Sequence, residues 1–416
     1  MADKLKNLLL AVLLLLMAGL LALTFFVSIQ GSRGGQRLLQ TMDEGESLVI
    51  PNVSGASAQP EVLAVLQPNG VFLADDGQSY DVLYRQMEPL WQEALGSAMA
   101  LEAVDSGDYR ALLQAPGILL QYHTAQPMYL LRAWSGSELT AEEMEVSGIA
   151  LVGMQEQVLL LVTDLQGGRW KAQTSASYGE LNSLCASVGS TNARLAGEHP
   201  ILSADQVLTE KTGSFDTVRI SAPDIAQRGE LSQNLLSLFG MNAYLTKVYL
   251  TADDSLVYVE GHSTVRLTPG GDLTYSGEGI DLELSAGDVV GRQAEICRKV
   301  YDRVLLLWQQ AGADGTLSLE SLRFEGSRGV LRFGLHLDGH YLERNEGHWV
   351  TVTVDSGRIT GITAALRQLE TGDSVKLLPT LQAAATVTEG RGAVRVRLLE
   401  QEGGLFVPGI CFVTEE

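Results

Sequence analysis

Three histidines in the C-terminal half of the chain lie close enough in sequence to suggest a metal site. His336 and His340 are four residues apart, Asp338 stands between them, and His348 follows. A spacing of four brings two histidines together on a helix, as in the H-E-x-x-H motif. Here apolar residues alternate over 331–337, which predicts a strand, and a strand would hold the two imidazoles roughly 13 Å apart. The pattern therefore favours a strand and an Asp-Gly turn over a metal site.

Other residue types that could do chemistry do not form a complete motif. Lys211-Thr212-Gly213 is the triplet found beside the active-site serine of penicillin-binding proteins, but no Ser stands three residues before any Lys, as S-x-x-K requires. A nucleophile elbow, a P-loop, a dinucleotide fingerprint and an EF-hand loop are all missing from the sequence. Adjacent acids such as Asp253-Asp254 are typical of a solvated surface in so acidic a chain. We therefore expect no enzyme, no cofactor and no bound metal ion.

Composition limits the partners further. Residues 1–40 carry four basic side chains and one acidic one, whereas the whole chain has a net charge of −21 at pH 7. The acidic excess thus lies beyond residue 40 and repels phosphate backbones, so we expect no nucleic-acid partner. Cys185, Cys297 and Cys411 are too few and too far apart for a disulfide framework. Their apolar neighbours predict buried, unreactive thiols.

The N-terminus predicts a membrane anchor. Residues Leu8 to Ile29 are 22 consecutive positions without a charged side chain. As a helix this segment is roughly 33 Å long, enough to cross the hydrocarbon core of a bilayer. The run is longer than a signal-peptide core and lacks a small-x-small cleavage site, which favours an uncleaved signal anchor. Lipid bilayer is therefore an expected partner of this helix.

The expected location is the cytoplasmic membrane, crossed once, with the C-terminal body outside the cytoplasm. Basic residues flank the span on both sides, so the positive-inside count is close to balanced. A short tail, one span and a large body that can be translocated favour the outside orientation. Ala11, Ala18, Gly19 and Ala22 form a small-residue stripe on one side of the helix, the usual basis of helix association in lipid. We predict that this stripe contacts another transmembrane helix.

Beyond the anchor, the pattern predicts an α+β fold with mainly antiparallel sheets. A Gly/Ser-rich stalk covers 31–60, after the tail and span at 1–30. An α+β domain follows at 61–206, with a hairpin across Pro68-Asn69-Gly70 and apolar spacings of three and four between 82 and 95 that predict a helix. Strands are expected at Gly117 to Tyr122, Met128 to Trp134, Gln157 to Thr163 and Trp170 to Thr174, and a helix at Tyr178 to Val188.

The remaining chain contains an internal repeat, in which a helix and three strands occur twice in the same order. The first module, 207–290, has a helix near 231–239 and a strand that ends in Gly261-His262. The second module, 291–416, has a helix near 289–310 and a strand that ends in Gly339-His340. The distance to the next Gly turn is ten residues in the first copy and eighteen in the second, which predicts an insertion in the second copy. A C-terminal hairpin closes this module.

These features together resemble the YycH/YycI proteins. The resemblance rests on the short tail, the single span, the α+β body and three local runs: Leu238-Phe239, Val257 to Tyr275, and Leu335 to Ile362 with Leu377-Leu378-Pro379. The C-terminal units also look like PepSY-type modules. YycH and YycI are membrane-anchored regulators of the WalK sensor kinase of Gram-positive bacteria. The resemblance implies a non-enzymatic protein that contacts a membrane sensor kinase, or a related membrane protein, through its span and external domains.

The leading hypothesis is accordingly a membrane-anchored, extracytoplasmic regulatory or scaffolding protein that modulates a two-component sensor kinase. Two alternatives remain open. A cell-envelope enzyme, such as a peptidoglycan hydrolase or peptidase, would be favoured by a pocket in which carboxylates, His and Ser converge. A PepSY-like inhibitor or ligand-binding module would be favoured by a peptide-sized groove along a sheet edge.

Overall fold

A computed structural model of the chain describes residues 59–74, 77–135, 144–189, 191–197, 199, 201–228, 231–387 and 392–414. Within these residues the fold is α+β with mainly antiparallel sheets, as the sequence predicts. None of the helices in these ranges is both long enough and apolar enough to cross a membrane. The predicted span at Leu8 to Ile29, with its stripe of Ala11, Ala18, Gly19 and Ala22, lies outside the described residues.

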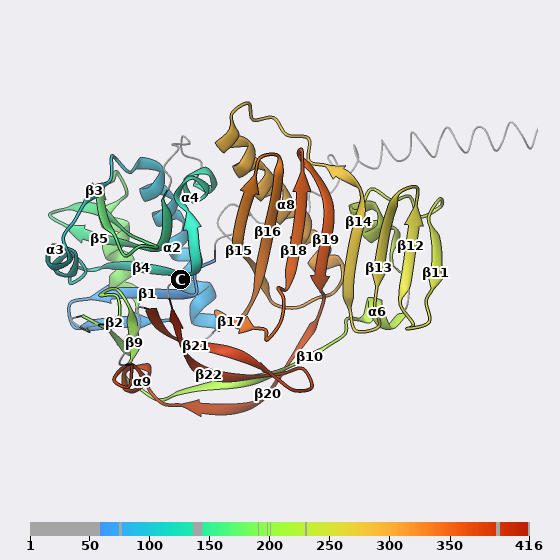
Figure 1. The fold of residues 1–416 in the computed structure, drawn as a ribbon. Helices are drawn as coiled ribbons and strands as arrows, with labels where there is room; N and C mark the ends of the chain where they lie inside the picture. The colour runs from blue at the N-terminus through green and yellow to red at the C-terminus, as the bar shows by residue number, and fades with distance from the viewer. Residues whose placement is uncertain are drawn as a thin grey trace, which may run out of the picture. The chain divides into compact units, whose positions relative to one another are not determined.

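The N-terminal part of the body forms one antiparallel sheet (Figure 1). Its central strands are buried on both faces, which explains why they appear in the sequence as almost continuous apolar runs. In sheet order, the strands are β3 (Glu102–Ala103), β7 (Arg169–Gln173), β6 (Gln157–Asp164), β5 (Glu145–Met154), β4 (Gly117–Pro127), β1 (Val62–Gln67), β2 (Gly70–Leu73), β8 (Ala193–Leu195) and β9 (Val207–Thr209).

Helices cover both faces of this sheet. α2 (Gly77–Ser97) and α5 (Tyr178–Ser187) pack on one face, against β1 and β6. α3 (Ser106–Leu112) covers the other face, where Tyr109 lies in an apolar cluster with residues of β1, β4 and β5. The hairpin β1–β2 and the helix α5 confirm the sequence predictions.

One predicted element is wrong. Met128–Trp134 forms helix α4, not a strand. The run is short and apolar except for Arg132, and such a run does not distinguish a buried strand from a buried helix. Pro127 precedes the helix, and Met128, Leu131 and Trp134, three residues apart, are all buried. The α-helical period decides the structure because α4 packs between α2 and α8 (Val289–Gln310).

The C-terminal part of the body contains a helix and a four-stranded antiparallel meander twice. α7 (Gln233–Leu238) precedes β11 (Lys247–Leu250), β12 (Leu256–Glu260), β13 (Ser263–Leu267) and β14 (Asp272–Asp281). α8 precedes β15 (Thr316–Glu325), β16 (Arg328–Leu337), β18 (Val350–Asp355) and β19 (Arg358–Ala365). The two meanders join through their last strands, β14 and β19, so that β11 and β15 lie at opposite outer edges. The predicted helix and three strands occur in this order in both copies, and each copy has one further strand, β11 or β15, that the sequence did not predict.

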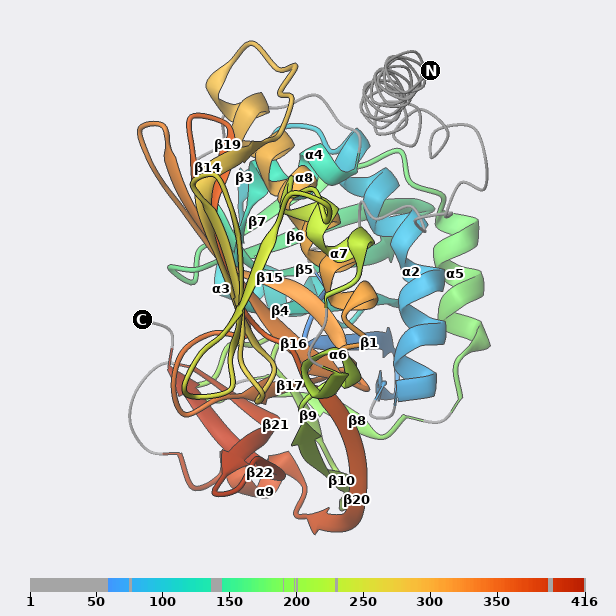
Figure 2. The same cartoon turned by 90° about the vertical axis from the view of Figure 1, so that its right-hand side faces the viewer.

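Five helices from the two parts form one layer. α5 contacts α2, α2 contacts α4, α4 contacts α8, and α8 contacts α7. Figure 2 shows these helices on one side of the sheets. α8 follows its predicted bounds, and its buried face includes Val300, Val304 and Leu307, at the spacings of an amphipathic helix.

The predicted insertion in the second module is β17 (His340–Glu343) with the loop that follows it. β17 leaves the meander after its hairpin with β16 and pairs in parallel with β21 (Gly392–Gln401). β21 forms the predicted C-terminal hairpin with β22 (Leu405–Thr414). Two long strands, β10 (Gly213–Ser221) and β20 (Gln368–Leu377), extend beside β22. Two short helices complete the described elements, α6 (Asp224–Arg228) and α9 (Thr380–Ala384).

Candidate functional site

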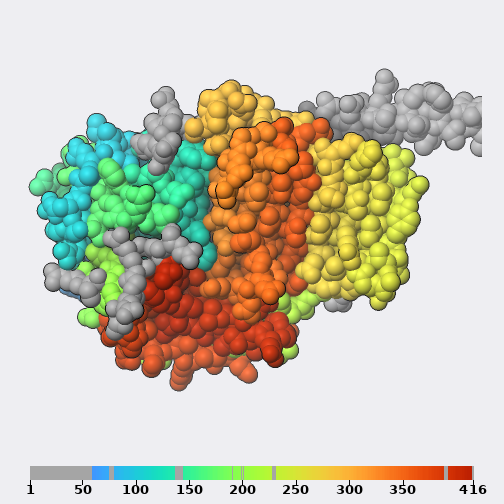
Figure 3. Space-filling model, viewed as in Figure 1, coloured from blue at the N-terminus to red at the C-terminus, as the bar shows by residue number. Residues whose placement is uncertain are grey.

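A polar cleft lies where the first sheet meets the second meander and the C-terminal hairpin. Its cavity measures about 630 Å³. Residues of β4, β15, β17 and β21 line it, and β4 touches β15 directly through side chains: Gln126 Nε2 donates to the Leu319 carbonyl at 3.0 Å, and the Thr124 hydroxyl donates to the Glu320 carbonyl. Figure 3 shows the two parts side by side, teal against orange.

Irregularities in the strands place the polar residues of this cleft. The ladder between β4 and β5 shifts between Gln121 and Gln126, which releases His123 and Thr124 from regular pairing. The ladder between β15 and β16 shifts at Glu320. β-Bulges re-aim side chains in this way and are frequent next to functional sites. The insertion β17 adds Glu343 from a third direction.

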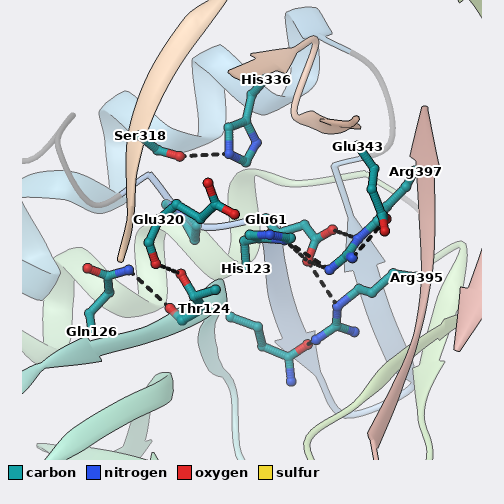
Figure 4. A network of polar contacts seen from close by, with 12 residues as sticks. Glu61, His123, Thr124, Gln126, Ser318, Glu320, His336, Glu343, Arg395 and Arg397 are labelled. Carbon is teal, nitrogen blue, oxygen red and sulfur yellow. Dashed lines mark hydrogen bonds and ion pairs between the residues drawn. The ribbon is translucent and has the colours of Figure 1, made fainter. Parts of the chain in front are cut away.

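A buried ionic cluster forms one wall of the cleft (Figure 4). Arg397 of β21 donates from Nε to Glu61 Oε1 at 2.9 Å and from Nη1 to Glu343 Oε2 at 3.1 Å. Arg395 Nε lies 3.5 Å from Glu61 Oε2. The side chains of Glu61 and Arg397 are only 4% and 5% exposed. The cluster therefore joins the residue that precedes β1 to the C-terminal hairpin.

The cluster holds Glu61 and Arg397 charged. Burial alone would raise the pKa of Glu61, but Arg397, His123 and Arg395 outweigh it and hold the pKa well below the usual range. Burial likewise works to lower the pKa of Arg397, while the Glu61 carboxylate and then Glu343 raise it. Arg397 Nη2 also lies 2.9 Å from His123 Nδ1, and because a guanidinium has only donors, Nδ1 is the acceptor.

Aromatic and imidazole groups extend the network toward β15. The Tyr341 ring stacks on His123 with centroids 3.6 Å apart, and Arg397 lies over the same ring at 5.4 Å. His348 Nδ1 donates to Glu320 Oε2 at 3.0 Å. Burial raises the pKa of Tyr341, so its hydroxyl stays protonated. Each of these groups is held by a hydrogen bond or by stacking.

Ser318 and His336 form the serine–histidine pair nearest this network. Ser318 Oγ lies 2.8 Å from His336 Nε2, and both residues are buried outside the cleft lining. Burial lowers the pKa of His336 to about 3, and its Nδ1 has no partner within the described part of the chain. A serine nucleophile needs access to substrate and an oriented base. This pair lacks both, and we interpret it as an internal hydrogen bond.

The cleft brings together carboxylates, one histidine (His123) and the serines Ser147, Ser203 and Ser321, the residue types that would favour the enzyme alternative. Cys411 lines it as well, and burial raises the pKa of its thiol, which disfavours the nucleophilic thiolate. Among the described residues, no group of three or more His, Cys, Asp or Glu is placed to hold a metal ion. The arrangement is suited to charge-assisted hydrogen bonds with a polar ligand or to fixing the junction.

Of the histidines, cysteines, acids and Lys211 singled out in the sequence, Cys411 lines this cleft and the others do not. His336 lies in β16 and His340 begins β17 after a turn at 338–339, which confirms the predicted strand and turn. His262 lies in the turn between β12 and β13, the equivalent place of the first meander. Lys211 precedes β10 on an exposed segment. Cys185 and Cys297 are buried free thiols with raised pKa values, as predicted, and Cys411 is half-buried.

Sequence reasoning missed Glu61, Arg395 and Arg397. Their only signal is the alternation of Arg395 and Arg397 with apolar residues in β21, a pattern that ordinarily indicates a solvated strand face. The partner carboxylate stands 336 positions earlier in the chain.

Comparison with known proteins gives the fold a precedent. No protein-family model matches the chain, and no curated protein sequence matches it significantly. Among solved structures, the crystal structure of YycH from Bacillus subtilis is similar with a TM-score of 0.55 and 10% sequence identity, over 86% of this chain and 94% of that chain. The chain has the fold of YycH. The resemblance predicted from the sequence is thus confirmed at the level of the fold.

The Bacillus megaterium YpeB C-terminal domain also aligns, over 47% of this chain and 86% of that domain, with 13% identity and a TM-score of 0.27. A TM-score this low does not establish a shared fold, so the PepSY-like character of the repeat modules stays a prediction.

Proposed function

We propose that this chain is a membrane-anchored, extracytoplasmic regulatory scaffold that modulates a membrane sensor kinase. The YycH fold, which extends over most of both chains, carries the proposal. YycH-type proteins regulate a sensor kinase, as the sequence resemblance implies. A difference of about 1–3 kcal/mol between the protein's affinities for two kinase states suffices for such regulation.

The anchor in this proposal is Leu8 to Ile29, and its contact face is the stripe of Ala11, Ala18, Gly19 and Ala22. At about 100° per residue these positions fall on one side of a helix. Small side chains let a neighbouring helix approach closely and gain packing contacts in lipid. The partner helix would belong to the kinase.

The body supports this proposal with an exposed apolar edge. All four residues of β11 are exposed, and Leu250 is 69% exposed. Tyr244 and Leu245, in the loop before β11, are 86% and 67% exposed. Contiguous exposed apolar residues on an edge strand are typical of protein–protein contact sites. A scaffold that contacts a kinase ectodomain needs a surface of this kind.

Co-purification of a kinase with the full-length chain from native membranes tests this function. The double variant Ala18→Leu and Ala22→Leu adds bulk to the stripe, and we expect it to reduce kinase recovery at least about fivefold. A fivefold change is the low end of the range for coupling between two binding sites. Thr24→Leu, on the opposite side of the helix, is the matched control and should leave recovery unchanged. Equal recovery with the double variant and the wild type would count against the helix contact.

The enzyme alternative has one observation in its favour, the approach of Glu61, Glu320 and His123 to one cleft. It predicts that purified chain cleaves peptidoglycan or a peptide and that Glu320→Gln abolishes cleavage. Activity that depends on Glu320 would replace the scaffold proposal.

A further inference from the structure

The polar cleft continues along β15 into a second cavity of about 620 Å³. The two cavities share Pro127, Glu145, Leu165 and Leu322 of their linings. The first borders β15 from Leu319 to Leu322, and the second borders it at Leu322 and Phe324. Together they form a groove that follows one strand. A groove along a sheet edge is the feature that, in the sequence analysis, favours a ligand-binding module.

β15 is an edge strand with an open outer side. Among the described strands it pairs with β16 alone. In the hairpin of β15 and β16, Glu325 and Arg328 form the last pair before the turn. In an antiparallel pair, the backbone N–H and C=O groups of successive residues point alternately toward the partner strand and away from it. Those of Arg323 and Ser321 therefore point toward β16. The backbone groups of Leu322 and Phe324 therefore point outward, and they have no hydrogen-bond partner within the described residues.

The other half of this edge is already occupied. Gln126 and Thr124 of β4 donate to the outer carbonyls of Leu319 and Glu320. Beyond Glu320 no such side chain caps the strand in the described structure. The open stretch is thus confined to the part of β15 that borders the second cavity.

The lining of the second cavity defines the ligand. Apolar and aromatic residues form most of it: Pro127, Tyr129, Met144, Leu165, Trp170, Leu322 and Phe324. Among the described lining residues, the charged ones are Glu145 and Asp164 and none is basic. Asp164 accepts hydrogen bonds from Trp170 Nε1 and from the Gly168 N–H, whereas the carboxylate of Glu145 has no partner among the described residues. A basic side chain with an aliphatic stem complements both features.

We propose that the groove along β15 binds an extended polypeptide segment with alternating basic and apolar side chains, by strand addition to Leu322 and Phe324. Main-chain hydrogen bonds give such complexes affinity, and pockets for alternate side chains give specificity. Apolar side chains of the segment enter the aromatic cavity, and a basic side chain faces Glu145. This binding does not depend on the proposed kinase partner, so each proposal can fail alone.

Fluorescence anisotropy with the full-length chain in nanodiscs tests the proposal. The probe is a labelled peptide of roughly eight residues that alternates Lys and Val, long enough to span the open edge. We expect it to bind at least about tenfold more tightly than a peptide that alternates Glu and Val. We expect the same margin over Lys-Val peptides that are N-methylated along one or the other edge of the extended peptide, because these lack the main-chain donors on that edge. Equal affinity for the N-methylated copies, or no binding below about 1 mM, would overturn the proposal.

Variants of the protein locate the binding site. Leu322→Pro removes an outward N–H, and Glu145→Lys reverses the charge; each should weaken binding at least about fivefold. The matched controls are Val248→Pro, on the outer edge of β11, and Glu402→Lys, outside both cavity linings; neither should change the affinity. Circular dichroism verifies that each variant is folded. Loss of binding in Val248→Pro with full binding in Leu322→Pro would place the peptide on β11 and overturn the assignment.

Discussion

The two four-stranded meanders have the same order of elements and differ at their outer strands. In the first meander the outer strand β11 is exposed along its whole length. In the second, Leu317, Ser318 and Leu319 of the outer strand β15 are buried beside β4. The same module therefore ends the sheet as a free surface in one copy and forms an internal junction in the other.

The turns after the second strands differ in the same way. A Cβ at Gly261, in the first meander, would meet no atom within 4 Å. A Cβ at Gly339, in the second, would lie 2.6 Å from the ring of Tyr80 in α2. The second meander also carries the insertion β17, which supplies Glu343 to the ionic cluster. We infer that substitutions near the second meander affect folding, whereas those on β11 affect partner binding.

The largest expected effect comes from the buried pair Glu61–Arg397. Glu61→Gln leaves two buried guanidinium groups without their shared carboxylate, and we expect the free energy of unfolding to fall by about 3–5 kcal/mol. Urea unfolding followed by circular dichroism measures it. Arg323→Met, which breaks an ion pair between side chains 81% and 71% exposed, is the control and should change little. Similar losses in both variants would contradict the difference between junction and surface.

The next effect is a pH dependence from His336. Burial lowers its folded-state pKa from 6.5 to about 3, so between these values the unfolded chain binds a proton that the folded chain does not. The stabilisation is complete above the unfolded-state pKa and is lost as the pH falls below it. From this group we expect a loss on the order of 2–3 kcal/mol between about pH 7 and pH 4.5.

His336→Gln keeps a possible partner for Ser318 and removes this titration. The test compares the slopes of unfolding free energy against pH, so a uniform destabilisation of the variant does not affect it. The variant should show the flatter slope, and parallel slopes would refute the role of His336.

A smaller effect distinguishes the two turns. Gly339→Ala places a methyl group against Tyr80 at a φ of +80°, and we expect a loss of about 2–3 kcal/mol. Gly261→Ala meets only the backbone cost of its φ of +57°, about 1 kcal/mol. Paired thermal melts measure the difference. Equal losses would indicate that the packing against α2 contributes nothing.

The smallest effect on folding is expected at β11. Tyr249→Ser and Leu250→Ser alter exposed side chains, so the free energy of unfolding should stay within about 0.5 kcal/mol. Kinase recovery in membrane pull-downs should nevertheless fall. A strongly destabilised variant would show that β11 is covered by the protein itself.

Local patterns predict the regular elements of this fold well. The period of the apolar residues predicts α8 over its observed range, and the unequal Gly spacing locates the insertion that becomes β17. The prediction for Met128–Trp134 fails because five of its seven residues are buried, the charged Arg132 among them, so polar positions do not mark an exposed helix face.

The candidate site was not predictable from local patterns. Arg397 and Glu61 meet only because β17 pairs with β21 and β4 contacts β15, and both contacts join segments far apart in sequence. The bulge at Glu320 interrupts an otherwise regular strand without a Gly or Pro to mark it. The groove along β15 depends on the same long-range contacts, and no residue type alone announces it.

Photo-crosslinking in native membranes tests the central claim most directly. A photoreactive residue at position 18 of the full-length chain, and a second one at position 249, should each capture the same integral-membrane sensor kinase, identified by mass spectrometry. Recovery of the chain from the medium, cut near Gln30, or capture of no kinase at either position would contradict the account.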